Sequence, residues 1–327
     1  MRRTLMRRTP CVALCAAVLC ALFPLLAAHA QQIKEQPPNS PTWAFPLITE
    51  MNIPEGPEPQ TLPGSSRSYT FAQIYDLLNP PDWFPDRHPA SPEIILKGHG
   101  RAQACASCHL INGLGRPEMG GLTGLPAGYI VQQLADFKSG ARIDAGGRMN
   151  NVAQDLSSQE ATQAADWFAS LESRAFTRVV ETGSVPESFV GPRGGTRFAK
   201  PGGGMEPIGA RIITLPEDAE RVRRRDPFAG YVAHVPVGSL AAGRTLVETG
   251  GAGKTTACGA CHGPGMRGLG NVPGLAGQHP IYTARQLYLF KDGRRNGPTA
   301  AMMKAAVERL TDEDIVAISG YLGSLTP

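Results

Sequence analysis

Two copies of one short motif, 153 residues apart, constrain this chain more than any other feature. Cys-x-x-Cys-His occurs at Cys105–His109 and again at Cys258–His262. On a helical turn, residues i, i+3 and i+4 share one face, so both thiols and the imidazole of each copy lie together. This spacing is the attachment signature of a c-type haem, whose iron then binds the histidine. The sequence therefore predicts two covalently bound haem c groups.

The motif assigns a role to each of its cysteines and histidines. We expect the haems to be attached through Cys105, Cys108, Cys258 and Cys261, and their irons to be bound by His109 and His262. Cys-x-x-Cys pairs also occur in redox dithiols, and two such pairs are the ligands of many four-cysteine zinc sites. Neither of those sites needs a histidine directly after the second cysteine. Its presence in both copies favours haem.

Residues 1–30 are predicted to be a secretory signal peptide. Four arginines precede an apolar run from Cys11 to Ala28, which ends in a small-x-small cleavage site at residues 28–30. We therefore expect a periplasmic protein whose mature chain starts at Gln31. No other apolar stretch approaches the roughly 20 residues of a membrane span.

Removal of this segment changes the charge and the cysteine content. The whole chain has 32 basic and 28 acidic residues, but the signal peptide holds four arginines and no acidic residue, so the mature chain is formally neutral. Three of the seven cysteines also leave, and the other four all belong to the two motifs. Haem propionates would add negative charge, which argues against nucleic acid as a partner.

The similarity between the two copies extends far beyond the motif. At the same offset, Gln133–Arg142 aligns with Gln286–Arg295 in the pattern Q-L-x-x-F-K-x-G-x-R. Self-similarity at a fixed offset indicates two copies of one structural unit. We divide the chain into a signal peptide (1–30), a Pro-rich N-terminal extension (31–85), a first repeat (86–175), an inter-domain insertion (176–237) and a second repeat (238–327).

Both repeats are predicted to be all-α, with the same order of elements. A helix precedes each motif, a glycine-rich loop follows it, and a second helix with apolar residues three to four apart comes next. A loop then carries a methionine, and a capped helix closes the repeat. The expected helices begin at Ser91–Glu93 and Ser239, span Tyr129–Ser139 and Ile281–Asp292, and end the repeats after capping motifs at Ser157–Glu160 and Thr311–Asp314.

The segments outside the repeats differ in composition. Residues 31–65 hold eight prolines and are expected to be extended, as a linker or a docking arm. The insertion is rich in Gly and Pro, with β-like runs at Arg211–Leu215 and Tyr231–Val237. We interpret it as a partly β-stranded connection, to which a flexible tether is the alternative.

Methionine is the expected second axial ligand of each iron. Met149 lies 40 residues after His109, and Met303 lies 41 residues after His262. Each of the two methionines precedes the leucine of the final capped helix by seven residues, which favours Met303 over its neighbour Met302. A His/Met pair is typical of electron carriers and raises the reduction potential.

Together these features resemble the dihaem cytochromes c built from tandem class I domains. The resemblance covers residues 91–171 and 239–326, through C-x-x-C-H, G-L-x-G, Y-x-x-x-Q-L-x-x-F-x-x-G-x-R, the methionine and L-[ST]-x-x-[ED]. It implies that Met149 and Met303 close over the distal haem faces. In that family a proline carbonyl accepts a bond from the ring N–H of the proximal histidine. Pro273 fits this role, and Gly120 takes its place in the first repeat.

Two functions compete at this point. The first is a periplasmic electron carrier between redox proteins, with a dehydrogenase as donor and an oxidase or reductase as acceptor. The surplus length favours a cytochrome subunit of a dehydrogenase. The second is a dihaem peroxidase, which needs one iron with an open distal site. Methionine at the same register in both repeats favours the carrier. For His279, an unrepeated histidine near the second motif, we expect a structural or exposed role and not iron ligation.

Overall fold

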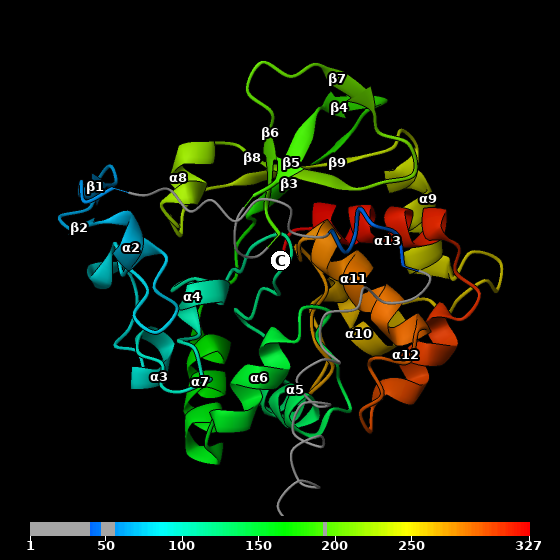
Figure 1. The fold of residues 1–327 in the computed structure, drawn as a ribbon. Coiled ribbons are helices and arrows are strands. Elements are labelled where there is room, and N and C mark those ends of the chain that lie inside the picture. The colour runs from blue at the N-terminus through cyan, green and yellow to red at the C-terminus, as the bar shows by residue number, and fades with distance from the viewer. Residues whose placement is uncertain (1–39, 47–55, 192–194) are drawn as a thin grey trace, which may run out of the picture.

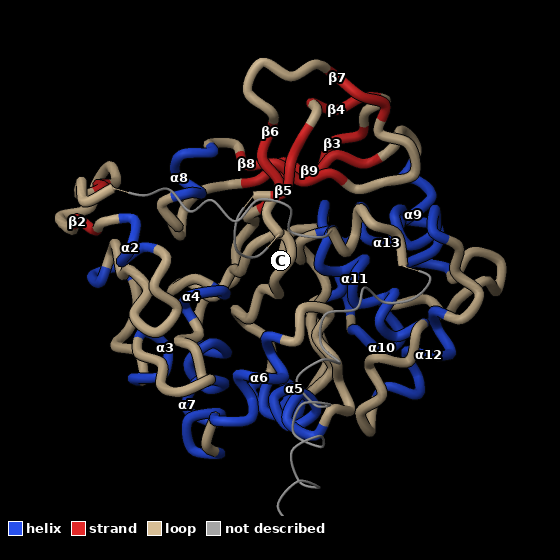
Figure 2. The backbone as a smooth tube through the Cα atoms, in the orientation of Figure 1, coloured by secondary structure: helices blue, strands red, loops and turns tan. Residues whose placement is uncertain are grey.

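Apolar residues three to four positions apart fold each repeat into helices with one buried face. The computed structural model describes residues 40–46, 56–191 and 195–327, so the predicted signal peptide lies outside the described residues. Two groups of helices, one from each repeat, lie on one side of a group of strands (Figures 1 and 2). The second repeat contains α9 (Ser239–Thr249), α10 (Gly259–His262), α11 (Pro280–Lys291), α12 (Ala300–Val307) and α13 (Asp312–Ser324).

The second repeat is organised around the crossing of its first and last helices. α9 packs against α13, and Val247 and Leu322 are buried in the shared core. The crossing is close because Gly243 has no side chain: a Cβ there would lie 2.1 Å from the carbonyl oxygen of Ala317. The motif Cys258–His262 follows α9 in the chain, so this crossing places it near α13, the last helix.

The first repeat has the same order of elements with one difference. Its helices are α3 (Glu93–Leu96), α4 (Ala106–His109), α5 (Ala127–Ser139), α6 (Arg148–Asp155) and α7 (Ser158–Ser170). The helix expected before the motif is reduced to the single turn α3. Pro89 and Pro92 lie where α9 has its first two turns, and proline lacks the N–H that a helix interior needs. Ile94 and Ile95 are nevertheless buried in the core of this repeat.

Both final helices begin with the predicted capping motifs. The Ser157 hydroxyl accepts a bond from the backbone N–H of Glu160, whose carboxylate accepts one from the N–H of Ser157. Thr311 and Asp314 form the same pair at α13. Each reciprocal cap satisfies two backbone donors that a helix start leaves without partners.

The strands between the two repeats form small sheets. They are β3 (Thr177–Glu181), β4 (Ser184–Pro186), β5 (Ser188–Val190), β6 (Arg197–Ala199), β7 (Met205–Pro207), β8 (Ile213–Pro216) and β9 (Tyr231–Val235), with α8 (Ala219–Arg223) before β9. β9 is the centre of a three-stranded sheet, parallel to β3 and antiparallel to β8, and the other strands pair as β4–β7 and β5–β6. Alternate β9 residues are buried, and Val235 packs beside Gly320 of α13.

The extension contacts both repeats and the insertion. Trp43 and Phe45 each make an edge-to-face contact with Tyr288 of α11, with ring centroids 6.3 Å apart. Residues 56–87 contain β1 (Gln60–Thr61), β2 (Ser68–Tyr69), α2 (Phe71–Ile74) and the 3-10 turn η1 (Pro85–Arg87). Their small core centres on Trp83, whose indole N–H donates to the carbonyl of Arg224, 2.8 Å away.

Within the described parts of the chain, no helix has both the length and the apolar character needed to cross a bilayer.

Candidate functional site: two equivalent haem-attachment turns

Each Cys-x-x-Cys-His motif forms one helical turn that ends in its histidine. α4 and α10 are these turns, and each begins directly after the first cysteine of its motif. The Nδ1 atom of His109 lies 2.8 Å from the carbonyl oxygen of Gly120, and that of His262 lies 2.8 Å from the carbonyl oxygen of Pro273. The first repeat therefore makes the predicted bond with a glycine carbonyl, at the same distance as the proline carbonyl in the second.

These bonds fix the chemistry of both imidazoles. A carbonyl oxygen only accepts, so Nδ1 carries the proton and Nε2 keeps the lone pair that a metal needs. Burial also lowers the pKa of His109 and of His262, although the carbonyl bonds act in the opposite direction. Both rings are thus held neutral and oriented, as the ligands of a haem iron are. The residues present fit covalently attached haem.

The alternatives for the cysteine pairs fit less well. A redox dithiol needs a lowered thiol pKa, whereas burial raises the pKa of Cys105 to about 12 and that of Cys258 to about 11. In the described parts of the chain, no three His, Cys, Asp or Glu side chains come together as a metal cluster. The two pairs therefore do not combine into a four-cysteine zinc site.

The candidate axial methionines lie on helices, and the expectation that a loop carries them is wrong. Met149 is in the first turn of α6 and Met303 is in α12. α6 begins at Arg148, one residue before Met149. Gly147 adopts the left-handed conformation there, and the Asp144 carboxylate accepts a bond from the N–H of Arg148. In α12, an alanine-rich sequence favours helix.

A pair of equivalent lysines bonds the backbone just after these helices. Lys138 donates from Nζ to the carbonyl of Leu156 over 3.0 Å, and Lys291 donates to the carbonyl of Leu310. Both leucines lie seven residues after the candidate methionine of their repeat. Met303 is half-buried against the core of the second repeat, whereas Met302 is 65% exposed. Met149 is also half-buried.

A buried polar cluster joins the two repeats, and sequence analysis assigned it no role. Arg142 donates to Gln133, to Gln286 (both 2.8 Å) and to the hydroxyl of Tyr282 (3.2 Å). Arg295 donates in the equivalent way to Gln286 (3.2 Å), Gln133 (2.8 Å) and the hydroxyl of Tyr129 (3.2 Å). The six residues are related in pairs by the offset of 153, so the repeat itself was the signal that would have found them.

The cluster holds two cations, and the buried Asp136 carboxylate reaches it only through Gln133, which donates to Asp136 over 3.3 Å. Arg142 and Arg295 are 6% and 8% exposed, and among the described residues neither forms an ion pair with a carboxylate. The Nε atom of Arg142 has no hydrogen-bond partner there. Burial alone would raise the pKa of Tyr129, yet the two guanidiniums hold it below its ordinary value. Buried guanidiniums are stabilised by a directly paired anion, and haem propionates have the charge for such a pair.

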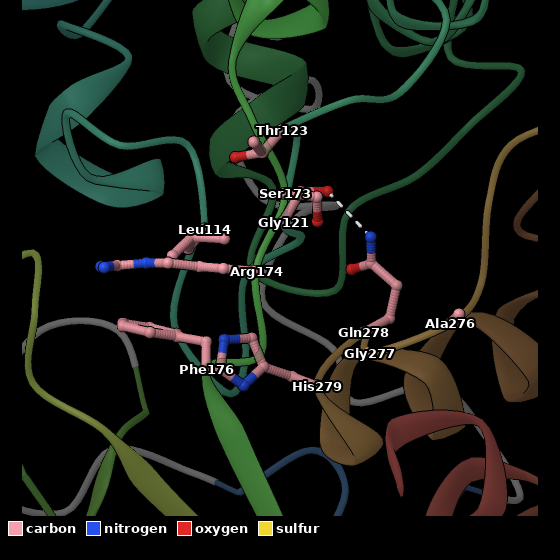
Figure 3. Close-up of a pocket in the computed structure, with 10 residues that line it drawn as sticks. All are labelled: Leu114, Gly121, Thr123, Ser173, Arg174, Phe176, Ala276, Gly277, Gln278 and His279. Atoms are coloured by element: carbon pink, nitrogen blue, oxygen red, sulfur yellow. Dashed lines mark hydrogen bonds between the residues drawn. The ribbon is translucent and has the colours of Figure 1, made fainter. Parts of the chain in front are cut away.

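A second contact between the repeats lies at their G-L-x-G loops. Figure 3 shows a pocket where Gly121 and Thr123 of the first repeat face Gln278 and His279 of the second. Gln278 donates from its side chain to the carbonyl of Gly121 over 3.3 Å. His279 is only 2% exposed, and its Nδ1 atom lies 2.6 Å from the hydroxyl of Thr177. This histidine joins the second repeat to β3, which is a structural role.

Comparisons with known proteins agree with the geometry of the second repeat. The family model for cytochrome c matches residues 240–326. Cytochrome c-554(548) of Halomonas halodenitrificans is 39% identical over 88 residues, which is 27% of this chain and 96% of the relative. The thiosulfate dehydrogenase electron acceptor of Thiomonas intermedia is 29% identical over 240 residues, 72% of this chain and 84% of the relative. Cytochrome c4 of Stutzerimonas stutzeri is 27% identical over 241 residues, covering 70% and 87%.

The Halomonas cytochrome matches almost over its whole length, and the family model covers the turn, the ring bond and the methionine helix of the second repeat. The chain therefore belongs to the cytochrome c family.

Proposed function

We propose that the protein is a periplasmic carrier of single electrons with two haem c groups, one in each of two tandem class I domains. The observation that carries this proposal is the equivalence of His109 and His262, each with Nδ1 bonded to a backbone carbonyl and Nε2 left to bind iron. When bound, haem c supplies an iron that exchanges one electron between its ferrous and ferric forms.

The chain's own residues would hold each haem in four ways. Cys105 and Cys108, or Cys258 and Cys261, would attach it covalently, and His109 or His262 would bind its iron. Met149 or Met303 would be the second iron ligand, which would raise the reduction potential and exclude external ligands. Arg142 and Arg295 supply positive charge for the propionates. Because Gln133 and Gln286 each accept bonds from both arginines, the two haem sites are fixed relative to one another.

The names of the relatives support the proposed partners. The Thiomonas protein is named as the electron acceptor of thiosulfate dehydrogenase. We propose that a dehydrogenase donates electrons to this chain in the same way, in the manner of a cytochrome subunit, and that an oxidase or reductase receives them. The predicted signal peptide supports a periplasmic location.

Methionine substitutions test the proposal. In Met149→Ala and in Met303→Ala, we expect the ferrous holoprotein to bind carbon monoxide at one haem, with a lower potential for that haem. The wild type and Met302→Ala, altered at the adjacent exposed residue, should stay low-spin and should not bind it. Visible spectra and redox titrations give both readings. Carbon monoxide binding by the wild type would instead support the peroxidase-like alternative. If Met302→Ala bound carbon monoxide and Met303→Ala did not, Met302 would be the iron ligand of the second repeat.

A further inference from the structure

The two haem-attachment edges differ sharply in exposure, although they are copies of one motif. In the first repeat, no residue from Ala102 to Thr123 is exposed. At the equivalent positions of the second repeat, several residues are exposed to solvent, and we call this set the open edge. The open edge consists of Ala260, Cys261, Pro264, Gly265, Arg267, Leu269, Gly270 and Asn271, which are all exposed.

Segments from outside the repeats cover the first edge. Asn112 donates from its side chain to the carbonyl of Pro227 in the insertion. Glu118 accepts a bond of 3.2 Å from the hydroxyl of Thr196, also in the insertion. On the other side, the N–H of Ala104 donates to a carbonyl of the extension, that of Leu77, over 3.0 Å.

The second edge lacks the side chains for such contacts. Gly265 is at the position of Asn112, so no amide is present to bond a covering segment. Asn271 is at the position of Glu118, and it lies beside Gly128 of α5 rather than beside the insertion. The extension reaches the second repeat at Tyr288, which is on α11 and not on the open edge. In the parts of the chain that the structure describes, the extension and the insertion thus close the first edge and do not cover the second.

The open edge carries almost no charge. Between Thr256 and Pro273, Arg267 is the only Lys, Arg, Asp or Glu residue, and His262 is buried and neutral. Leu269 is 62% exposed, and the other uncharged residues of the open edge are small or medium-sized. A surface of this kind gains little from long-range attraction, and complexes on it form through apolar contact.

We propose that the open edge is the docking surface for a redox protein that presents its own cofactor in a weakly charged, apolar patch, and that the first edge takes no partner. This inference rests on the proposed function. Cys261 is one of the attachment residues, so a protein seated there approaches the haem edge directly. One electron then passes between the ferrous haem and the partner's oxidised centre, and no proton moves. The encounter is expected at the small end of interfaces, below about 1,200 Å².

Electron exchange with a stated probe tests the surface. The reduced holoprotein is mixed in a stopped-flow instrument with an oxidised blue-copper protein of low net charge, whose Cu(II) takes up one electron. We expect Leu269→Glu and Leu269→Lys each to lower the second-order rate constant by about tenfold, because each buries an unpaired charge in the encounter complex. Met205→Glu is the matched control, since Met205 is 61% exposed on β7, and it should leave the rate constant within about twofold of wild type.

Nuclear magnetic resonance gives a reading that does not depend on turnover. Titration of the ferric holoprotein with the redox-inert zinc form of the same probe should shift the haem-methyl signals of one haem only, and Leu269→Glu should abolish that shift. Equal shifts of both haems would overturn the inference, as would a rate constant unaffected by Leu269→Glu. If Leu269→Glu lowered the rate constant and Leu269→Lys raised it, docking would be governed by charge, and this result would also overturn the inference.

Two further measurements separate this inference from other outcomes. Sedimentation of the wild type should give a monomer, and a dimer dissociated by Leu269→Glu would assign the open edge to a second copy of the chain and overturn the docking of a redox protein. The haem content and visible spectrum report on the proposed function instead. If Leu269→Glu kept two haems and an unchanged spectrum, the proposed function would stand. An unchanged rate constant in the same variant would then refute the docking surface alone.

Discussion

At the scale of single residues, His279 places a neutral imidazole at the junction of both repeats and the insertion. Its ring makes edge-to-face contacts with Phe176 and Tyr231, and its Nε2 atom has no hydrogen-bond partner among the described residues. Burial lowers the pKa of His279 to about 4, and the nearby carbonyl of Leu114 offsets part of this lowering. Protonation therefore favours the unfolded chain.

This low pKa predicts a loss of stability in mild acid. Because the folded-state pKa is below the unfolded value, the unfolded state takes up the proton first, and stability is lost as pH falls from about 6.5 towards 4. Between pH 7 and pH 5 the His279 contribution should fall by about 2 kcal/mol. His279→Asn removes the titrating ring, so its free energy of unfolding should depend less on pH than that of the wild type. Denaturant titrations at both pH values measure the difference, and identical pH dependence would contradict the assignment.

The arginine pair gives a second prediction at this scale. Arg142→Gln removes one buried positive charge, which stabilises the ferric state relative to the ferrous one and so lowers the reduction potentials. For a charge at about 10 Å in a medium of effective dielectric constant about 20, the expected shift is about 70 mV.

Arg101→Gln is the control for this change, because the Arg101 side chain is 61% exposed and pairs with Asp155 at the surface. Its potentials should match the wild type in a spectroscopic redox titration. Unchanged potentials in Arg142→Gln would show that the cluster does not act on the haems.

At the scale of elements, the sequence predicted most helices because their signals are local. The capping pairs Ser157–Glu160 and Thr311–Asp314 and the apolar spacing of α5 and α11 depend only on neighbouring residues. The helix α3 begins at Glu93, where the sequence predicted a start, but it has a single turn because Pro89 and Pro92 occupy the positions of the first two turns of α9. The early start of α6 depends on the Asp144 side chain, which sequence spacing does not indicate.

The crossing of α9 and α13 supports a prediction about the second repeat alone. Gly243→Val would place atoms against the Ala317 carbonyl and Tyr321, so the helices must separate. We expect a loss of about 3 kcal/mol in the free energy of unfolding, the upper end for overpacking. Ala242→Val, on the exposed face of α9, should cost less than about 1 kcal/mol. Denaturant titration followed by circular dichroism compares the two variants, and equal losses would rule out the close crossing.

At the scale of the whole molecule, the extension and the insertion contact each other and pack on both repeats. Their union depends on contacts between distant residues, such as Trp83 with Arg224, which neither segment shows in its own sequence. The same is true of the reciprocal bonds of Arg142 and Arg295. The sequence therefore indicated the chemistry of each haem site, whereas the relation between the sites required the structure.

Trp83 provides the test of this union. Trp83→Ala removes a side chain that is 1% exposed and should cost about 3–5 kcal/mol locally. Trp83→Phe keeps most of the ring but loses the bond to Arg224, and should cost about 1–2 kcal/mol. Hydrogen exchange should show faster exchange at residues 60–90 and 219–231 together in both variants, and faster exchange in only one of these segments would mean that they fold separately.

The reciprocal bonds between the repeats have a consequence for how such a chain arises. Arg142 contacts Gln286 as Arg295 contacts Gln133, which is the pattern of an isologous interface between identical subunits. A gene for one repeat would specify a protein that dimerises through this surface, and the fraction of dimer would depend on the protein concentration. Fusion of two copies makes the pairing intramolecular and independent of concentration. Fusion also allows the two repeats to diverge in sequence, so that one can be enclosed while the other stays open to partners.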